Sequence, residues 1–301
     1  MNHSLLSRRS LLAAMALPAL AGCGSPLPLG AAPGRDAGAE LDARRRLRDS
    51  AEAHGLAAYR QLSDINVGYS GQWRPLVGRL QPEVVDEGFR GSSQERLMPK
   101  AAMSAQAYTG IKGRKQVVWR RGSGAAGDLG NVAVWFNGMR SDDATAQQAA
   151  ALVAEAYGLF LLGPLWLADR DLPARLAGTE RVDGRSCDVV EVWLTPGLGR
   201  VASDRIALCI DRSDGLTRRV RFTLEGFVNT QGAVAEVDTF EHERRFGVMW
   251  PMRSYERVRH PIALPAHDWR ITGLDVNRGY APQALMGAEF SGSAARDAGS
   301  A

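Results

Sequence analysis

The sequence predicts a mainly β protein of the α+β class, organised around one antiparallel sheet. The main observation is a long series of short segments that alternate apolar and polar residues, separated by glycine, proline and charged residues. Short turns without intervening helices favour a meander, in which consecutive strands pair as neighbours. Only two segments have helical periodicity. With 45% hydrophobic residues, the chain can bury a sizeable core.

The two helices are expected near residues 39–62 and 141–157. In the first, many apolar residues recur at spacings of three and four and would share one face. Its basic run at residues 44–48 is interpreted as the solvated side, and attraction to anionic lipid is the alternative. In the second, Asp142 or Asp143 can accept hydrogen bonds from the first free amides of the helix.

The strands follow from the alternating segments and the turn residues between them. Lys112-Gly113 is expected to turn the chain inside one of these segments. The segments are residues 65–70, 88–98, 105–120, 131–138, 179–182, 186–194, 203–211, 217–226, 234–241, 246–250, 252–259 and 268–277.

One hairpin can be assigned a register. If its turn centres on Leu198, Cys187 lies opposite Cys209, and Glu191 lies opposite Arg205 as a cross-strand ion pair. In an oxidising compartment two such thiols would form a disulfide, so a Cys187–Cys209 bond is predicted. Two buried, reduced thiols are the alternative.

The first 23 residues have the pattern of a bacterial export signal that ends in a lipobox. Arg8 and Arg9 precede a short apolar run, which ends in Leu20-Ala21-Gly22-Cys23. The run is shorter than the roughly 20 residues that a transmembrane helix needs. Cys23 is therefore expected to carry a diacylglyceryl anchor with acyl chains such as palmitate, and an ordinary secretory signal is the alternative. The Arg8-Arg9 pair leaves both general and twin-arginine export open.

The expected organisation has four parts. Residues 1–22 would be the signal peptide, and residues 23–38, rich in Gly, Ser, Pro, Leu and Ala, a flexible tether. One folded domain would cover 39–286, followed by a disordered tail over 287–301. Removing the signal peptide lowers the formal net charge from +4 to +2, because only Arg8 and Arg9 are charged there. A net charge this close to zero does not indicate a nucleic-acid-binding surface.

No catalytic or cofactor motif stands out. The sequence contains no complete Gly-x-Ser-x-Gly elbow, phosphate loop or dinucleotide fingerprint. His54, His242, His260 and His267 follow the lipobox, and no third ligand for a metal site can be named. The chain is therefore expected to be a non-enzyme without cofactor or metal, and a periplasmic hydrolase is kept as an alternative.

A hydrophobic ligand cavity is expected on the concave side of the sheet, because two helices alone would not fill it. The apolar segment 159–167 is interpreted either as a lid over this cavity or as a core-facing helix end. The aromatic residues expected to line the cavity are Trp119, Trp135, Trp193 and Trp250. The residues expected to close it are Leu162, Leu165 and Trp166. In the alternative reading, these side chains fill the core completely.

The order of elements resembles the LolA/LolB superfamily, which includes the periplasmic lipoprotein carrier, its outer-membrane receptor and the sensor domain of RseB. The resembling span is roughly residues 51–284, and its clearest motifs are Val132–Phe136, Val182–Val190 and Ile206–Arg219. The resemblance implies an open antiparallel half-barrel of about 10–11 strands with helices on the concave side.

These expectations combine into one functional hypothesis. The chain would be anchored by lipid on the periplasmic side of the cell envelope, and Gly24 after the lipobox favours the outer over the inner membrane by analogy. It would bind a lipid or acylated polypeptide and act in lipoprotein handling or envelope sensing. An envelope-stress regulator that binds an envelope protein partner is the main alternative.

Overall fold

The computed structural model describes residues 37–224, 227, 233–260 and 262–285. The predicted signal peptide, the lipidation site Cys23, most of the tether and the tail lie outside the described residues. The described helices are α1 (Ala37–Ala53), α2 (Leu56–Tyr59), α3 (Pro75–Leu80), α4 (Pro82–Val85) and α5 (Ala144–Leu162). Short 3₁₀ turns are η1 (Pro99–Ala101), η2 (Ala125–Gly127), η3 (Gly163–Trp166) and η5 (Pro282–Leu285).

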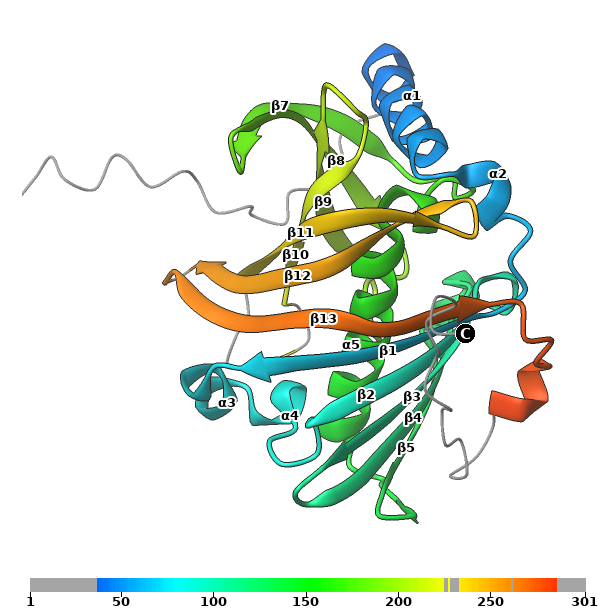
Figure 1. Cartoon of the computed structure of the whole chain (residues 1–301), viewed down its shortest axis with the longest axis vertical. Helices are drawn as coiled ribbons and strands as arrows, with labels where there is room; N and C mark the ends of the chain where they lie inside the picture. Colours follow the sequence, from blue (N-terminus) through cyan, green and yellow to red (C-terminus); the bar gives the residue numbers. More distant parts are fainter. Residues whose placement is uncertain (1–36, 225–226, 228–232, 261, 286–301) are drawn as a thin grey trace, which may run out of the picture.

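One antiparallel sheet of 13 strands forms the body of the protein (Figure 1). The prediction of a mainly β, open half-barrel is confirmed. The strands are β1 (Ile65–Trp73), β2 (Ser92–Met98), β3 (Met103–Gly110), β4 (Gly113–Arg121), β5 (Gly130–Phe136), β6 (Met139–Arg140), β7 (Ala174–Val182), β8 (Arg185–Leu194), β9 (Asp204–Asp211), β10 (Thr217–Thr223), β11 (Val234–Arg245), β12 (Val248–His260) and β13 (Leu264–Val276).

The chain path explains the strand order. The first strand, β1, lies in the interior of the sheet, and β2 to β6 are added outward from it to one edge. The chain then crosses through α5 to the other edge, where β7 begins a second meander that returns inward. Its last strand, β13, pairs with β1, so that two halves of the sheet join along this pair. The sheet is not closed, because β6 and β7 are both edge strands.

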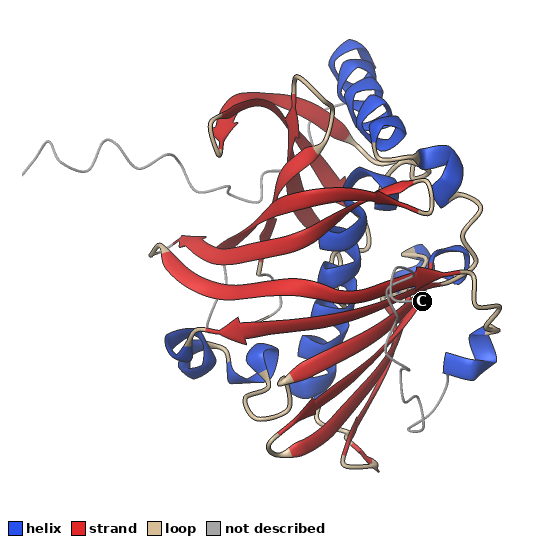
Figure 2. Ribbon diagram, viewed as in Figure 1, coloured by secondary structure: helices blue, strands red, loops and turns tan. Residues whose placement is uncertain are grey.

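The helix α5 covers the concave face of the sheet (Figure 2). Of the two predicted caps, Asp142 and Asp143, it is Asp143 that caps this helix, since its carboxylate accepts hydrogen bonds from the amides of Thr145 and Ala146. Every residue of α5 from Ala149 to Leu162 is buried. The stretch Ala144–Trp166 is long and apolar enough to cross a membrane, with mean hydropathy 1.5, but 94% of its most apolar window is buried inside the fold. It is therefore the core helix of this domain.

The helix α1 packs on the β7 edge of the sheet. The prediction that its basic run is only solvated is wrong for Arg46, whose Nε donates to Asp188 on β8 at 2.8 Å. Its Nη2 also donates to the carbonyl oxygen of Asp211 at 2.8 Å. Arg46 therefore fastens α1 across the ends of two strands.

The predicted register of the β8–β9 hairpin is wrong by two residues. Cys187 lies opposite Asp211, and Cys209 lies opposite Val189. Both thiols are free and buried, so the predicted disulfide is not present in the structure. A shift of two residues keeps each side chain on its face, because strand residues alternate between faces with a period of two. Both cysteines accordingly sit in one small apolar cluster on the face opposite α5.

Residues 246–260 were also predicted incorrectly, as two strands that break near Pro251. The structure has one continuous strand, β12, in which Pro251 pairs with His242 of β11. The turn that precedes it is formed by Phe246 and Gly247, both with positive φ angles of 54° and 78°.

Candidate functional site

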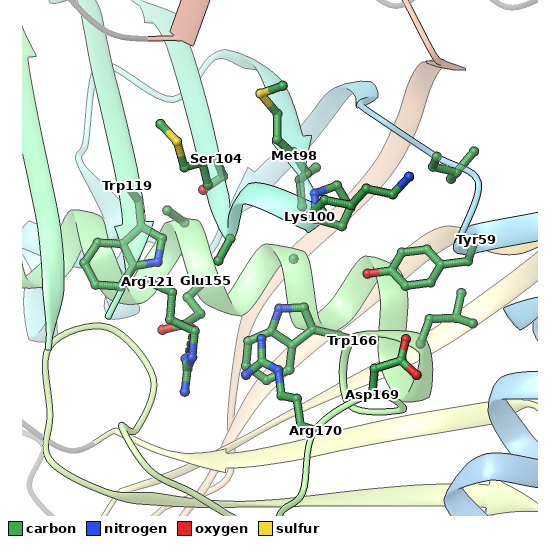
Figure 3. A pocket seen from close by; sticks show the side chains of 18 of the residues that line it. Tyr59, Met98, Lys100, Ser104, Trp119, Arg121, Glu155, Trp166, Asp169 and Arg170 are labelled. Atoms are coloured by element: carbon green, nitrogen blue, oxygen red, sulfur yellow. Dashed lines mark ion pairs between the residues drawn. The ribbon is translucent and has the colours of Figure 1, made fainter. Parts of the chain in front are cut away.

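The candidate site is a cavity of about 320 Å³ between α5 and the edge of the sheet where β2 ends, β3 begins and β4 ends (Figure 3). Its walls come from four parts of the chain: α2, the β2–η1–β3 corner, β4, and α5 with the following η3 turn. Trp119 and Arg121 lie at one end in Figure 3, Tyr59 and Asp169 at the other, and Trp166 lies between them. Side chains distant in sequence therefore converge on one cavity.

The inner wall of this cavity is apolar. Leu62, Leu97, Trp119 and Leu165 line it and are each at most 6% exposed. Gly158 on α5 lies against this wall without a side chain. A Cβ at this position would lie only 3.3 Å from Leu97 Cδ2, so a larger residue would crowd the wall. This combination of one bulky aromatic, aliphatic side chains and a glycine gives a surface suited to an apolar ligand.

A buried ion pair forms the polar end of the cavity. The guanidinium of Arg121 on β4 contacts the carboxylate of Glu155 on α5, and their side chains are 10% and 2% exposed. Glu155 also accepts a hydrogen bond from the amide of Gly199 at 2.6 Å, in the loop between β8 and β9. Gly199 has a φ of +68°, and a Cβ there would lie 2.9 Å from the backbone nitrogen of Leu152. Only glycine therefore fits this close approach between loop and helix.

The rim of the cavity is cationic. Arg170 lies over the ring of Trp166, with its Cζ 3.6 Å from the ring centroid. Arg121 approaches the same ring at 5.2 Å. Arg60 is neutralised by Asp169, with Nε 3.1 Å from the carboxylate. Within the described part of the chain, Arg170 and the exposed Lys100 form no ion pair with an acid, so the lining carries two uncompensated positive charges.

Arg121 and Arg170 stay charged at neutral pH. Burial, with a smaller contribution from the charge of Arg170, lowers the pKa of Arg121 to about 9. Burial likewise lowers the pKa of Arg170 to about 10. Burial raises the pKa of Tyr59 to about 12, so this phenol stays neutral. The cavity thus joins an apolar wall to a rim that attracts an anionic group.

Of the residues predicted from the sequence to line or close a cavity, three meet here: Trp119, Leu165 and Trp166. Leu162 and Trp250 lie in the main core, at 2% and 0% exposure, away from this cavity. The segment 159–167 is largely core rather than an outer lid.

Trp135 and Trp193 lie elsewhere on the sheet. In β5 the neighbours Val134 and Phe136 belong to the α5-covered core, so Trp135 points to the opposite face. Trp193 likewise alternates with core residues of β8 and lies between Arg175 and Arg205, at 5.5 and 5.9 Å from its ring centroid. Trp193 is therefore a second tryptophan whose ring contacts two arginines, but it does not line the cavity.

Sequence reasoning missed the polar part of the site. Arg121, Glu155 and Arg170 come from a strand, a helix and a turn, and no local pattern links them. The apolar neighbourhood of Glu155 is the one available signal, because an acid inside an otherwise apolar helix must have a partner.

The histidines do not form a hydrolytic site in the described residues. His267 is stacked between Trp73 and Trp269, and its Nδ1 lies 3.0 Å from the Tyr157 hydroxyl. His242 lies 3.1 Å from an Arg218 nitrogen instead of a carboxylate. No group of three or more His, Cys, Asp and Glu residues that could hold a metal is found among the residues described.

No family model matches the sequence, and no curated protein matches it either. Similar solved structures include a DUF1329 family protein from Desulfovibrio piger, with 12% identity, a TM-score of 0.48, and coverage of 82% of this chain and 99% of that one. A LolA superfamily protein from Nitrosomonas europaea has 12% identity, a TM-score of 0.47, and coverage of 81% and 97%.

A putative outer membrane lipoprotein-sorting protein domain from Vibrio parahaemolyticus has 9% identity, a TM-score of 0.41, and coverage of 81% and 97%.

Proposed function

We propose that this protein is a lipid-anchored component of the bacterial envelope that binds an amphiphile, such as a lipid or an acylated polypeptide, in the cavity beside Trp166. The observation that carries the proposal is the pairing of an apolar wall with a rim that has two uncompensated cations, Lys100 and Arg170. An apolar chain would lie against Leu97, Trp119 and Leu165. An anionic end would lie at the rim.

The size of the cavity favours a ligand with one apolar chain over one with several. Ligand pockets commonly have volumes of about 300–1,000 Å³. At about 320 Å³, this cavity is at the small end of that range. Its open side faces the rim, where the remainder of a larger ligand, such as a polypeptide, would extend into solvent.

In this proposal the lipid anchor and the cavity act together. Diacylation of Cys23 would hold the domain at a membrane surface through the segment before α1, so that amphiphiles would reach the cavity over a short distance. The expected location is the periplasmic side of the envelope, with the outer membrane favoured. The function would belong to lipoprotein handling or envelope sensing, without catalysis.

The first experiment is native mass spectrometry of the Cys23→Ala variant, which lacks the proposed lipid anchor and can be purified without detergent. A co-purifying fatty acid or phospholipid supports the proposal. A bare protein mass, together with no binding of a fluorescent fatty acid in titration, would refute it and leave recognition of a protein partner as the leading function.

Two tryptophan variants then locate the binding site. Trp166→Leu should weaken binding of the fluorescent fatty acid at least tenfold, because it removes the ring that holds Arg170 at the rim. Trp193→Leu is the matched control, since Trp193 also contacts two arginines but lies outside the cavity. Equal losses in both variants would contradict this assignment.

A further inference from the structure

A second cluster lies away from the proposed ligand cavity, where the loop after α4 meets β1, β3 and α5. Its centre is Arg90, whose side chain is only 6% exposed. The guanidinium lies against three aromatic rings, with Cζ 5.5, 4.6 and 6.0 Å from the centroids of Trp73, Tyr108 and Tyr157. Such ring faces favour a cation, but they supply no hydrogen-bond acceptors in the guanidinium plane.

The hydrogen-bonding capacity of this cluster is largely unused. None of Nε, Nη1 and Nη2 of Arg90 forms a hydrogen bond of normal geometry with a described residue, although the guanidinium lies close enough to the Tyr157 hydroxyl to oppose the rise of its pKa. The indole nitrogen of Trp73 and the hydroxyl of Tyr108 are also buried without a partner there. Buried donors in native proteins are nearly always paired with protein groups or with bound molecules, so these unpaired donors point to a bound acceptor at this position.

The charges of the cluster also do not balance. The carboxylate nearest to Arg90 belongs to Asp86, 3.8 Å from Nε, and it also contacts the ammonium group of Lys115, which is 1% exposed. Two buried cations therefore share one carboxylate. Burial raises the pKa of Glu95 to about 8 and that of Glu256 to about 7, with the charge of Arg90 opposing the shift in both cases. Neither acid is fully ionised at neutral pH.

A small cavity lies where these donors meet. Trp73, Arg90 and Tyr108 all line it, and its volume is about 20 Å³. A cavity needs roughly 10–15 Å³ to hold one water-sized occupant, so this one matches a single small ion better than a polyatomic anion such as phosphate. The pairing of β1 with β2 ends at Ser70 and Ser92, and both residues are exposed there, which gives the cavity an opening to solvent.

We propose that the Arg90 cluster binds one small monovalent anion of the halide class, such as chloride. The ion would lie beside the Arg90 guanidinium and accept hydrogen bonds from the Trp73 indole and the Tyr108 hydroxyl. It would balance the excess buried charge and hold the loop before β2 against Tyr157 of α5. This site is independent of the proposed amphiphile cavity, and neither proposal depends on the other.

The neighbouring titratable groups make this binding dependent on pH. Burial raises the pKa values of Tyr69, Tyr108 and Tyr157, and burial lowers the pKa of His267 well below its usual value, so these four groups stay neutral. The ionisation of Glu95 and Glu256 remains as the competing source of negative charge. Anion binding should therefore be stronger near pH 6, where both acids are protonated, than near pH 9.

The test is thermal unfolding of the purified protein at constant ionic strength, in sodium chloride, bromide or gluconate at pH 6. Chloride and bromide should raise Tm in a saturable way relative to gluconate, which is too large for the cavity, and the rise should shrink at pH 9. Arg90→Gln should abolish the halide effect, and Arg79→Gln, which changes an exposed arginine on α3, should keep it. Equal Tm values in chloride and gluconate would overturn the proposal.

A second measurement covers the case in which Arg90→Gln does not fold. The ³⁵Cl NMR line of a chloride solution should broaden on addition of wild-type protein, and added bromide should remove that broadening by competition. Trp73→Phe removes one donor and keeps an aromatic ring. This variant should bind chloride several-fold more weakly than the wild type, as measured by the same line broadening. Absence of any saturable broadening with the wild-type protein would overturn the assignment independently of the variant.

Discussion

The ion pair between Arg121 and Glu155 provides a quantitative test of how the amphiphile cavity is held together. Glu155→Ala removes the carboxylate that contacts Arg121 and the acceptor for the Gly199 amide. Because Arg121 is only 10% exposed, its charge would remain buried without a counter-ion. Loss of one partner from a buried pair costs about 3–5 kcal/mol. Arg121 keeps contacts with the carbonyl oxygens of Pro196 and Gly197, which puts the expected loss near the lower end, about 3 kcal/mol.

The assay is urea unfolding of the wild type and the variant, with the free energy of unfolding taken from midpoint and slope. Asp169→Ala is the control, because it removes an acid from an exposed pair in the same cavity, with side chains 45% and 56% exposed. Exposed pairs contribute about 0–1 kcal/mol, so this variant should lose less than about 1 kcal/mol. Equal losses in the two variants would refute the reasoning from burial.

A double variant separates the pair from the contacts around it. Replacing both partners by apolar side chains, Arg121→Met with Glu155→Leu, should recover most of the stability lost in Glu155→Ala, since no buried charge remains. A double variant that is less stable than Glu155→Ala would show that the hydrogen bonds to the β8–β9 loop dominate over the charge pairing.

Two further predictions concern the other half of the sheet. Although burial opposes it, hydrogen bonding to Arg221 and the charge of Arg219 lower the pKa of Glu236 to about 2, so its stabilisation is complete above about pH 4.5 and is lost as the pH falls toward 2. Glu236→Gln should therefore flatten the fall of Tm over this range, and an unchanged acid profile would contradict the pairing. Burial raises the pKa of Cys187 to about 11 and that of Cys209 to about 12, so both thiols should resist a thiol-specific reagent at pH 8 and react only in urea. Fewer than two reactive thiols among these positions in urea would mean that a disulfide forms after all.

Features set by local chemistry could be predicted from the sequence. The cap at Asp143 needs only a carboxylate before a helical stretch, and the strand segments need only alternation and turn residues. The face on which each β8 and β9 residue lies also follows from alternation alone. The pairing partner does not, because a shift of two residues leaves every face unchanged. Here the turn centres on Gly199 instead of Leu198, so Cys187 meets Asp211.

The candidate site could be predicted only in its apolar part. Trp119, Leu165 and Trp166 stand out in the sequence as bulky apolar residues near a helix end or within a strand. Arg121 and Glu155 form their contact only because α5 crosses back over β4, which depends on the path of the whole chain. For the same reason the Arg90 cluster is invisible in the sequence, since its members come from β1, the loop after α4, β3 and α5.

The pairing of β1 with β13 has a consequence for biogenesis. These strands contain residues 65–73 and 264–276, so the seam joining the two halves of the sheet cannot form until residue 276 has been synthesised. Until then β1 exposes an unpaired edge at the point where the second half must attach, and such long-range pairing is slow because a large loop must close first. A premature stop before residue 264 would therefore leave a half-sheet in which β1 is an unpaired edge strand, a species prone to aggregation. A chaperone would therefore have to bind this chain for longer than one whose first and last strands are the edge strands of its sheet.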